Sequence, residues 1–110
     1  MDKNCLLLIN SWPQAHTPLQ EALDMASTLQ LFGHKVNVHM TDSALLLLQK
    51  DNNDWRETFS MMQDLGVEFS TSLDTMLNYA SVDPAITVHA LRHEDANHLK
   101  KSAHFVWSCC

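Results

Sequence analysis

The sequence predicts an α/β protein in which helices cover both faces of a parallel sheet. Short apolar runs of strand length alternate with segments of helical period, in the order β-α-β-α-α-β-α-β-α-β over 110 residues. The first run, Cys-Leu-Leu-Leu-Ile at residues 5–9, is apolar throughout, which is typical of a strand covered on both faces. Alternating elements of these lengths indicate right-handed crossovers. We therefore expect one domain, residues 1–110, folded as a three-layer α/β/α sandwich with a five-stranded parallel sheet.

The segment that follows the first strand has a strong helix start. Thr17 is placed to act as N-cap, Pro18 stands at the first helical position, and Gln20 completes a capping box. Apolar residues then recur at helical spacing through residue 29. Gly33 supplies a left-handed stop. These features predict the first helix over residues 18–33.

The middle of the chain predicts a strand, two helices and a second strand. Residues 36–40 alternate apolar and polar side chains, and residues 41–43 offer a cap for a short apolar helix over 44–48. Residues 50–53 interrupt the pattern. Asn53 or Asp54 then caps a helix that ends at Gly66, and a strand follows over residues 67–71.

The last part of the chain alternates twice more between helix and strand. Ser72 is a candidate N-cap for a helix over residues 73–80. The remaining elements are expected to be a strand over 86–91, a polar helix over 93–101 and a strand over 103–108. In a parallel sheet, ligands bind beyond the carboxyl ends of the strands. Those ends fall at residues 10–16, 41–43, 70–74, 92–95 and 108–110.

Charge and glycine content exclude several functions. The formal net charge is -6, so we expect no nucleic-acid partner and no anionic membrane partner. No apolar run approaches the ~18 residues of a spanning helix, and the N-terminal run is too short for a secretory signal, which favours the cytoplasm. Both glycines follow predicted helices, so a glycine-rich phosphate loop is excluded. The seven histidines lack ligand spacing, and we expect neither a metal nor a cofactor.

The three cysteines fall into two groups. Cys5 lies within an apolar strand, where burial makes it a small inert hydrophobe. Cys109 and Cys110 are adjacent, and their Cα atoms, ~3.8 Å apart, are too close for an ordinary disulfide, so two free thiols are expected. Their position at the carboxyl end of the last strand suits the presentation of a thiol to a partner. We therefore take Cys109 and Cys110 as the candidate catalytic residues.

The order of elements also resembles a known family. Leu-Leu-Leu-Ile-Asn-Ser at 6–11 with a proline in the next loop, the helix over 18–33 and His-Lys-Val-Asn-Val at 34–38 resemble the opening of the DsrE/DsrF/DsrH family, which includes the TusB, TusC and TusD subunits. The likeness continues through 40–44, 65–68 and the closing strand–helix–strand, nearly the whole chain. It implies cytoplasmic sulfur trafficking, in which a cysteine persulfide passes sulfur to a partner's thiol. It also implies homo- or hetero-oligomers of related subunits, often trimers or hexamers.

This sequence departs from the family's pattern at one position. In the DsrE and TusD type, the sulfur-carrying cysteine follows the third strand, and the resemblance places that position at or beside Ser72. A hydroxyl cannot hold a persulfide, because the exchange requires a thiolate. The chain thus resembles a DsrF/TusC-like or diverged DsrE-like member, an oligomeric sulfur-relay subunit without the usual catalytic cysteine. In such a subunit Cys109 or Cys110 is the alternative carrier.

Two other functions fit the same scaffold. One is a small-ligand or protein-binding module without sulfur transfer, in which Trp12, His16, Asp42 and Ser72 line a cleft at the strand ends. The alternative for Trp12, favoured over a ligand-binding role, is that it packs over the start of the first helix. The other is a purely structural oligomer without a pocket. The sequence alone leaves these alternatives open, and it names neither the sulfur donor nor the acceptor.

Overall fold

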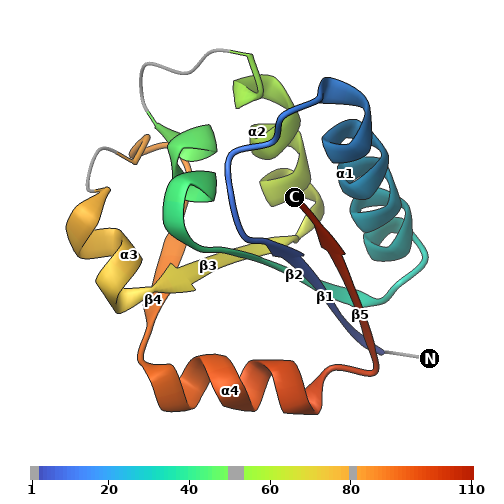
Figure 1. Ribbon diagram of the computed structural model, residues 1–110. Coiled ribbons are helices and arrows are strands. Elements are labelled where there is room, and N and C mark those ends of the chain that lie inside the picture. Colours follow the sequence, from blue (N-terminus) through green and yellow to red (C-terminus); the bar gives the residue numbers. More distant parts are fainter. Residues whose placement is uncertain (1–2, 50–53, 80–81) are drawn as a thin grey trace.

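The computed structural model describes residues 3–49, 54–79 and 82–110, which form one five-stranded sheet with helices on both faces (Figure 1). The strands are β1 (Asn4–Ile9), β2 (Lys35–Met40), β3 (Glu68–Ser72), β4 (Val88–Leu91) and β5 (Phe105–Cys109). Their order across the sheet is β4-β3-β2-β1-β5, and all neighbouring pairs are parallel. The predicted α/β sandwich with a five-stranded parallel sheet is confirmed.

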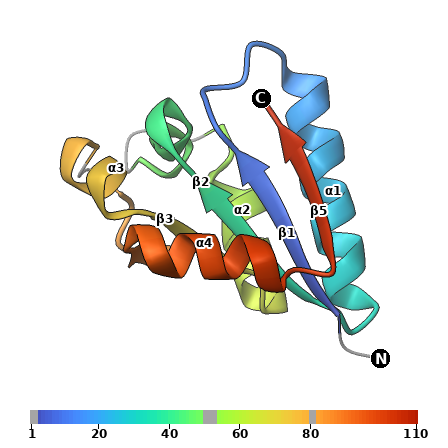
Figure 2. The same ribbon diagram turned by 60° about the horizontal axis from the view of Figure 1, so that its bottom comes forward.

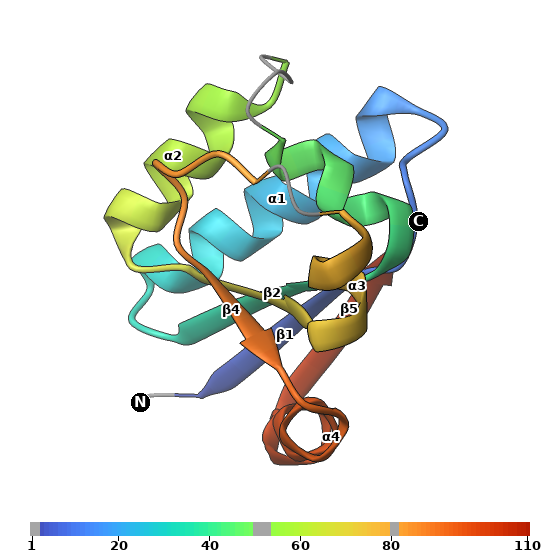
Figure 3. The same cartoon turned by 90° about the vertical axis from the view of Figure 1, so that its left-hand side faces the viewer.

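Helices connect successive strands. They are α1 (His16–Leu31), the 3-10 helix η1 (Asp42–Leu48), α2 (Arg56–Leu65), α3 (Leu73–Asn78) and α4 (His93–Ser102). Figures 1 and 3 show α1 and α2 on one face of the sheet and α4 on the other. The chain adds β2, β3 and β4 in one direction, and α4 then carries it back across the sheet to place β5 beside β1 (Figure 2). The strand order therefore reverses between β1 and β5.

The main core lies between the sheet and helices α1 and α2. Alternate strand residues point to this face, so that Leu7 pairs in register with Val38, and Val38 with Phe69. The Phe59 ring of α2 meets Phe69 edge to face, with 5.6 Å between the ring centroids. These aromatic and aliphatic side chains are almost completely buried. Their burial is the dominant favourable contribution to folding and fixes which face of each strand is turned inward.

The structure corrects the predicted start of the first helix. Helix α1 begins at His16 after Ala15, and no side chain caps it, so Thr17 is not the N-cap and the predicted capping box is absent from this helix. The His16 ring stacks on Trp55 with 4.6 Å between centroids, which favours an earlier start. Pro18 still lies within the first turn, where its missing N–H costs no helical hydrogen bond.

Other boundaries shift by a few residues. The short helix predicted over 44–48 is a 3-10 helix that starts at Asp42, and Trp55 rather than Asp54 occupies the N-cap position of α2. The last two strands begin two residues later than predicted. Before β4, the Ile86 N–H donates to the Asp83 carbonyl in a turn, which delays the start of that strand. Predictions at residues 50–53 and 80 lie outside the described residues.

Three predicted turn residues are confirmed. The Ser72 hydroxyl oxygen accepts a hydrogen bond from the Thr75 N–H and caps α3. Gly33 and Gly66 end their helices with φ values of +92° and +104°, in the left-handed region that favours glycine. Within the described parts of the chain, no helix has the combined length and apolar character that crossing a membrane requires.

Candidate functional site

The reversal of strand order between β1 and β5 defines the candidate site. In open α/β sheets, ligands bind beyond the carboxyl ends of the strands, at the point where the strand order reverses. Ser11 follows β1 closely and Cys110 follows β5. The Ser11 hydroxyl donates a 2.7 Å hydrogen bond to the backbone oxygen of Cys110. This bond ties the two strand ends together and fixes the backbone that carries the terminal thiol.

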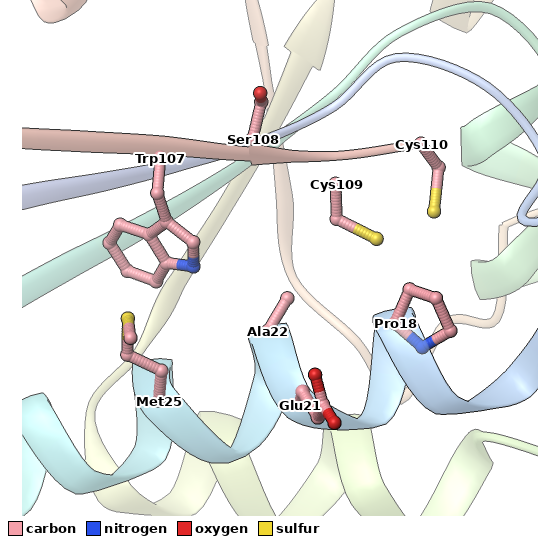
Figure 4. Close-up of a pocket in the computed structure, with 8 residues that line it drawn as sticks. All are labelled: Pro18, Glu21, Ala22, Met25, Trp107, Ser108, Cys109 and Cys110. Carbon is pink, nitrogen blue, oxygen red and sulfur yellow. The ribbon is translucent and has the colours of Figure 1, made fainter.

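A cavity of about 370 Å³ separates β5 from α1 at this point (Figure 4). Its helical wall is formed by Pro18, Glu21, Ala22 and Met25, whose spacing of three and four residues places them on one face of α1. The opposite wall is β5, residues 107–110. Because side chains alternate along a strand, Trp107 and Cys109 turn toward the helix. The volume falls within the ~300–1,000 Å³ range of small-molecule sites.

A second cavity of about 400 Å³ lies on the loop between β1 and α1. The residues around it are Ser11, Trp12, Gln14, Ala15, Pro18 and Cys110. Trp12 is 44% exposed, which leaves much of its ring open to solvent. Pro18 and Cys110 border both cavities. A ligand in either cavity can therefore approach the Cys110 thiol.

The two adjacent thiols have different environments. Both are free, but Cys109 is buried and Cys110 is exposed. Burial raises the pKa of Cys109 to about 12, and a side-chain hydrogen bond and the charge of Cys110 add to the rise. Cys109 is therefore protonated at neutral pH and can donate its S–H to the neighbouring sulfur. Since exchange requires an accessible thiolate, Cys110 is the thiol of this pair that a donor can reach.

Cys5 belongs to a different environment. It lies at the amino end of β1, in register with Phe105, and is 3% exposed. Burial raises the pKa of its thiol, although the Lys3 charge opposes this. The prediction that Cys5 is a buried hydrophobe is confirmed.

The four residues predicted to line a cleft lie at three separate places: Trp12 at one, Asp42 with Ser72 at a second, and His16 at a third. Trp12 lines the loop cavity, and its backbone N–H donates to the Ser43 hydroxyl at 2.8 Å. Asp42 and Ser72 meet through Thr75, whose Oγ1 accepts from the Asp42 N–H at 3.3 Å and from the Ser72 hydroxyl at 2.6 Å. His16 instead turns toward Trp55.

Ser72 and Cys110 stand at the ends of different strands. Strands β2 and β1 lie between β3 and β5, so three interstrand spacings of ~4.8 Å, about 14 Å, separate the two strand ends. Within one chain these residues therefore do not act on the same atom. The structure thus separates the position that the family resemblance indicates from the position that carries the thiols.

Sequence reasoning missed Glu21, Met25 and Trp107 as residues of the site. The helical spacing on α1 and the alternation along β5 place these residues on one face of each element. That the two faces line one cavity can be recognised only once β5 is known to lie beside β1 and against α1. Among the described residues, no group of three or more His, Cys, Asp or Glu side chains is arranged to hold a metal ion.

The fold and the site define a small α/β protein with a cysteine pair at the switch point of a five-stranded parallel sheet. No protein-family model matches the chain, and no curated protein matches it in sequence. Solved structures do match. The ychN protein from E. coli has a TM-score of 0.81 and 10% identity, over 97% of this chain and 99% of that one.

Two further structures, both described as proteins of unknown function, share the fold. MTH1491 from Methanobacterium thermoautotrophicum has a TM-score of 0.75 and 10% identity over 97% of this chain and 99% of its own. BT1422 from Bacteroides thetaiotaomicron has a TM-score of 0.71 and 16% identity over 96% and 94%. At these identities the similarity establishes a common fold, which each chain covers almost completely. It says nothing about shared chemistry.

Proposed function

We propose that this protein is a diverged DsrE-like sulfur-relay subunit in which Cys110 holds sulfane sulfur as a persulfide. The observation that carries the proposal is the exposed Cys110 thiol, which borders two cavities at the switch point of the sheet. Ser72, the last residue of β3, supports the same assignment. Its hydroxyl is engaged in capping α3 and has no thiol chemistry.

The proposed transfer is a thiol–persulfide exchange. The Cys110 thiolate attacks the outer sulfur of a donor persulfide, R–S–SH, and forms a new S–S bond. The donor's own S–S bond breaks, its electron pair stays with the donor as R–S⁻, and solvent protonates that thiolate. An acceptor thiolate repeats the exchange on the outer sulfur of the Cys110 persulfide. Cys109 stays protonated throughout and donates its S–H to the attacking sulfur.

We also propose that the subunit works in an oligomer, a trimer or hexamer of this chain or of related chains, in the cytoplasm. The edge strand β5 supports assembly, because it presents Phe105 and Val106 at 45% and 44% exposure and carries no charged residue. An uncharged apolar edge strand is prone to pair with another chain. Leu31 and Phe32, at 69% and 76% exposure, add a second apolar patch at the end of α1.

The test is sulfur loading followed by intact-protein mass spectrometry. After exposure to inorganic polysulfide and removal of the excess, the native chain should gain the mass of one sulfur atom. Treatment with dithiothreitol should remove this added mass. Cys110→Ser should abolish the gain. Cys5→Ala and Ser72→Ala are matched controls that keep both thiols of the pair and should load normally. Loading that persists in Cys110→Ser would contradict the assignment of the carrier.

A second function is favoured by the loop cavity itself. Trp12 presents an exposed aromatic surface beside a space of about 400 Å³, which suits a small ligand or a partner's side chain without sulfur transfer. The two functions differ in their need for thiols. Replacing all three cysteines by serine should leave such binding intact, whereas sulfur carriage would be lost.

A further inference from the structure

We infer that the cavity between β5 and α1 binds a free amino-acid persulfide, of the cysteine persulfide type, as the sulfur donor to Cys110. The inference rests on the proposed function and specifies its substrate class. It is drawn from three chemically different features on the cavity walls. These are an indole N–H without a partner, a carboxylate, and the thiol pair.

The Trp107 indole supplies the first feature. Its Nε1 atom is buried and has no hydrogen-bond partner among the described residues. Figure 4 shows this nitrogen on the edge of the ring nearest Cys109, along the wall of the cavity. A buried N–H that lacks an acceptor costs ~1–3 kcal/mol. Trp107 borders the cavity but its nitrogen is closed to water, so the N–H has no acceptor in the free protein; in our inference a carboxylate oxygen of the ligand becomes that acceptor after a small turn of the ring.

Glu21 supplies the second feature. It stands on α1, on the wall opposite Trp107, and is exposed to the cavity and to solvent. Pro18, Ala22 and Met25, its neighbours on this helical face, bring no charge. A carboxylate among apolar side chains favours a cationic group in the ligand, such as a protonated amine.

The thiol pair determines which end of the bound ligand reacts. Both sulfur atoms are turned toward α1 in Figure 4, and the Cys110 sulfur lies near Pro18 at the mouth of the cavity. A ligand that places an ammonium group at Glu21, a carboxylate at Trp107 and a sulfur at Cys110 is an α-amino acid with a sulfur-bearing side chain. Its persulfide form is the donor that the exchange requires.

The size of the cavity and the charged groups of the ligand together distinguish a free amino-acid donor from a protein donor. A volume of about 370 Å³ has room for a molecule of amino-acid size, with space left for solvent. A persulfide carried on a folded protein has no free ammonium or carboxylate beside its sulfur, because both are part of peptide bonds. Glu21 and Trp107 would therefore discriminate between a free amino acid and a peptide-bound cysteine.

The reaction keeps the balance of the proposed exchange. The Cys110 thiolate bonds to the outer sulfur of cysteine persulfide, the S–S bond of the donor breaks, and free cysteine leaves as its thiolate, which solvent protonates. The products are the Cys110 persulfide and cysteine. No external oxidant or reductant takes part, because sulfane sulfur is only transferred.

The experiment compares three donors on the whole chain, namely cysteine persulfide, N-acetylcysteine persulfide and inorganic polysulfide. Initial rates of Cys110 persulfide formation are followed by mass spectrometry. Trp107→Phe removes the indole N–H and keeps an aromatic ring, and Glu21→Gln removes only the charge. Asp24→Asn, on the exposed side of the same helix, is the matched control. Circular dichroism verifies that each variant is folded.

The inference predicts a donor-specific pattern. Trp107→Phe and Glu21→Gln should each slow loading from cysteine persulfide about tenfold more than they slow loading from polysulfide, as expected for the loss of one hydrogen bond or one ion pair to the amino-acid donor. N-acetylcysteine persulfide, which has no ammonium group, should load slowly and be insensitive to Glu21→Gln. Asp24→Asn should behave as the native chain does.

Two results would overturn the inference in distinguishable ways. If polysulfide loads Cys110 but both cavity variants react with cysteine persulfide at the native rate, the cavity does not select this donor, and the proposed function stands without it. If no donor loads Cys110 in the native chain, the proposed function fails together with the inference. Glu21→Gln changes an exposed side chain, so the test remains decisive should Trp107→Phe fold poorly.

Discussion

His39 Nδ1 and Ser70 Oγ lie 2.8 Å apart across the paired strands β2 and β3, on the sheet face opposite α1. Both side chains are buried. Burial lowers the pKa of His39 to about 4, and the positive charge of Lys100 on α4 adds to this effect. The imidazole is therefore neutral in the folded protein at neutral pH and shares a hydrogen bond with the serine hydroxyl.

This pair predicts a loss of stability in acid. Between pH 6.5, the ordinary pKa of histidine, and about 4, the unfolded chain binds a proton at His39 that the folded chain does not. The free energy of unfolding should therefore decrease as the pH falls through this range, by about 3 kcal/mol from this group, and level off below it. Urea unfolding at several pH values measures the slope.

The corresponding variants isolate the contribution of His39. His39→Gln has no titrating ring, so its unfolding free energy should depend less on pH in this range than that of the native chain. The control, His89→Gln, removes an exposed histidine from β4, the strand on the other side of β3, and should keep the native slope. Equal slopes in His39→Gln and the native protein would contradict the argument.

The difference between the thiols predicts selective alkylation. Iodoacetamide at about pH 8 should modify Cys110 in the folded protein, because Cys5 and Cys109 are buried and burial raises the pKa of both thiols. Peptide mapping should find one modified cysteine before unfolding and three after it. Cys110→Ser should remain unmodified when folded. Rapid modification of Cys109 in that variant would show that its burial does not protect it.

Asp83 predicts a large effect of a single carboxylate. Its side chain is 5% exposed, with Oδ2 2.9 Å from Arg56 Nε, and Oδ1 accepts from the Ala85 N–H. Asp83→Ala leaves these donors without their acceptor and should lower the free energy of unfolding by about 2–3 kcal/mol. The matched control is Glu68→Ala in the exposed 3.8 Å pair with Lys35, which should cost less than about 1 kcal/mol. Equal losses in chemical denaturation would contradict this ranking.

The two glycines predict a graded pair of substitutions. Both have positive φ, so alanine is strained at either position, and Gly33→Ala should cost about 1 kcal/mol. A Cβ at Gly66 would also come within 2.9 Å of Gln30 Nε2, and Gln30 Oε1 accepts from the Val36 N–H. Gly66→Ala should therefore cost about 2 kcal/mol, because Gln30 must move. Equal melting temperatures for the two variants would show that Gln30 moves at no cost.

Local patterns were enough to predict the fold class. The apolar run at 5–9, the helical spacing before Gly33 and the cap at Ser72 are properties of neighbouring residues, and the structure confirms the elements that they indicate. The helix start near Thr17 was predicted wrongly, because the stacking of His16 on Trp55 is a long-range contact. A local pattern cannot include a partner that lies 39 residues away.

The candidate site, like the fold, could be predicted from the sequence only in part. The sequence by itself predicted that Cys109 and Cys110 are free adjacent thiols at the carboxyl end of a strand, and that a serine stands where the third strand ends. Only the tertiary structure decided that the thiols face α1, that Trp107 and Glu21 flank them, and that Ser72 lies at a separate strand end. The reason is physical: residue chemistry and periodicity are local, whereas the neighbours of an edge strand depend on where the returning helix α4 places it in the sheet.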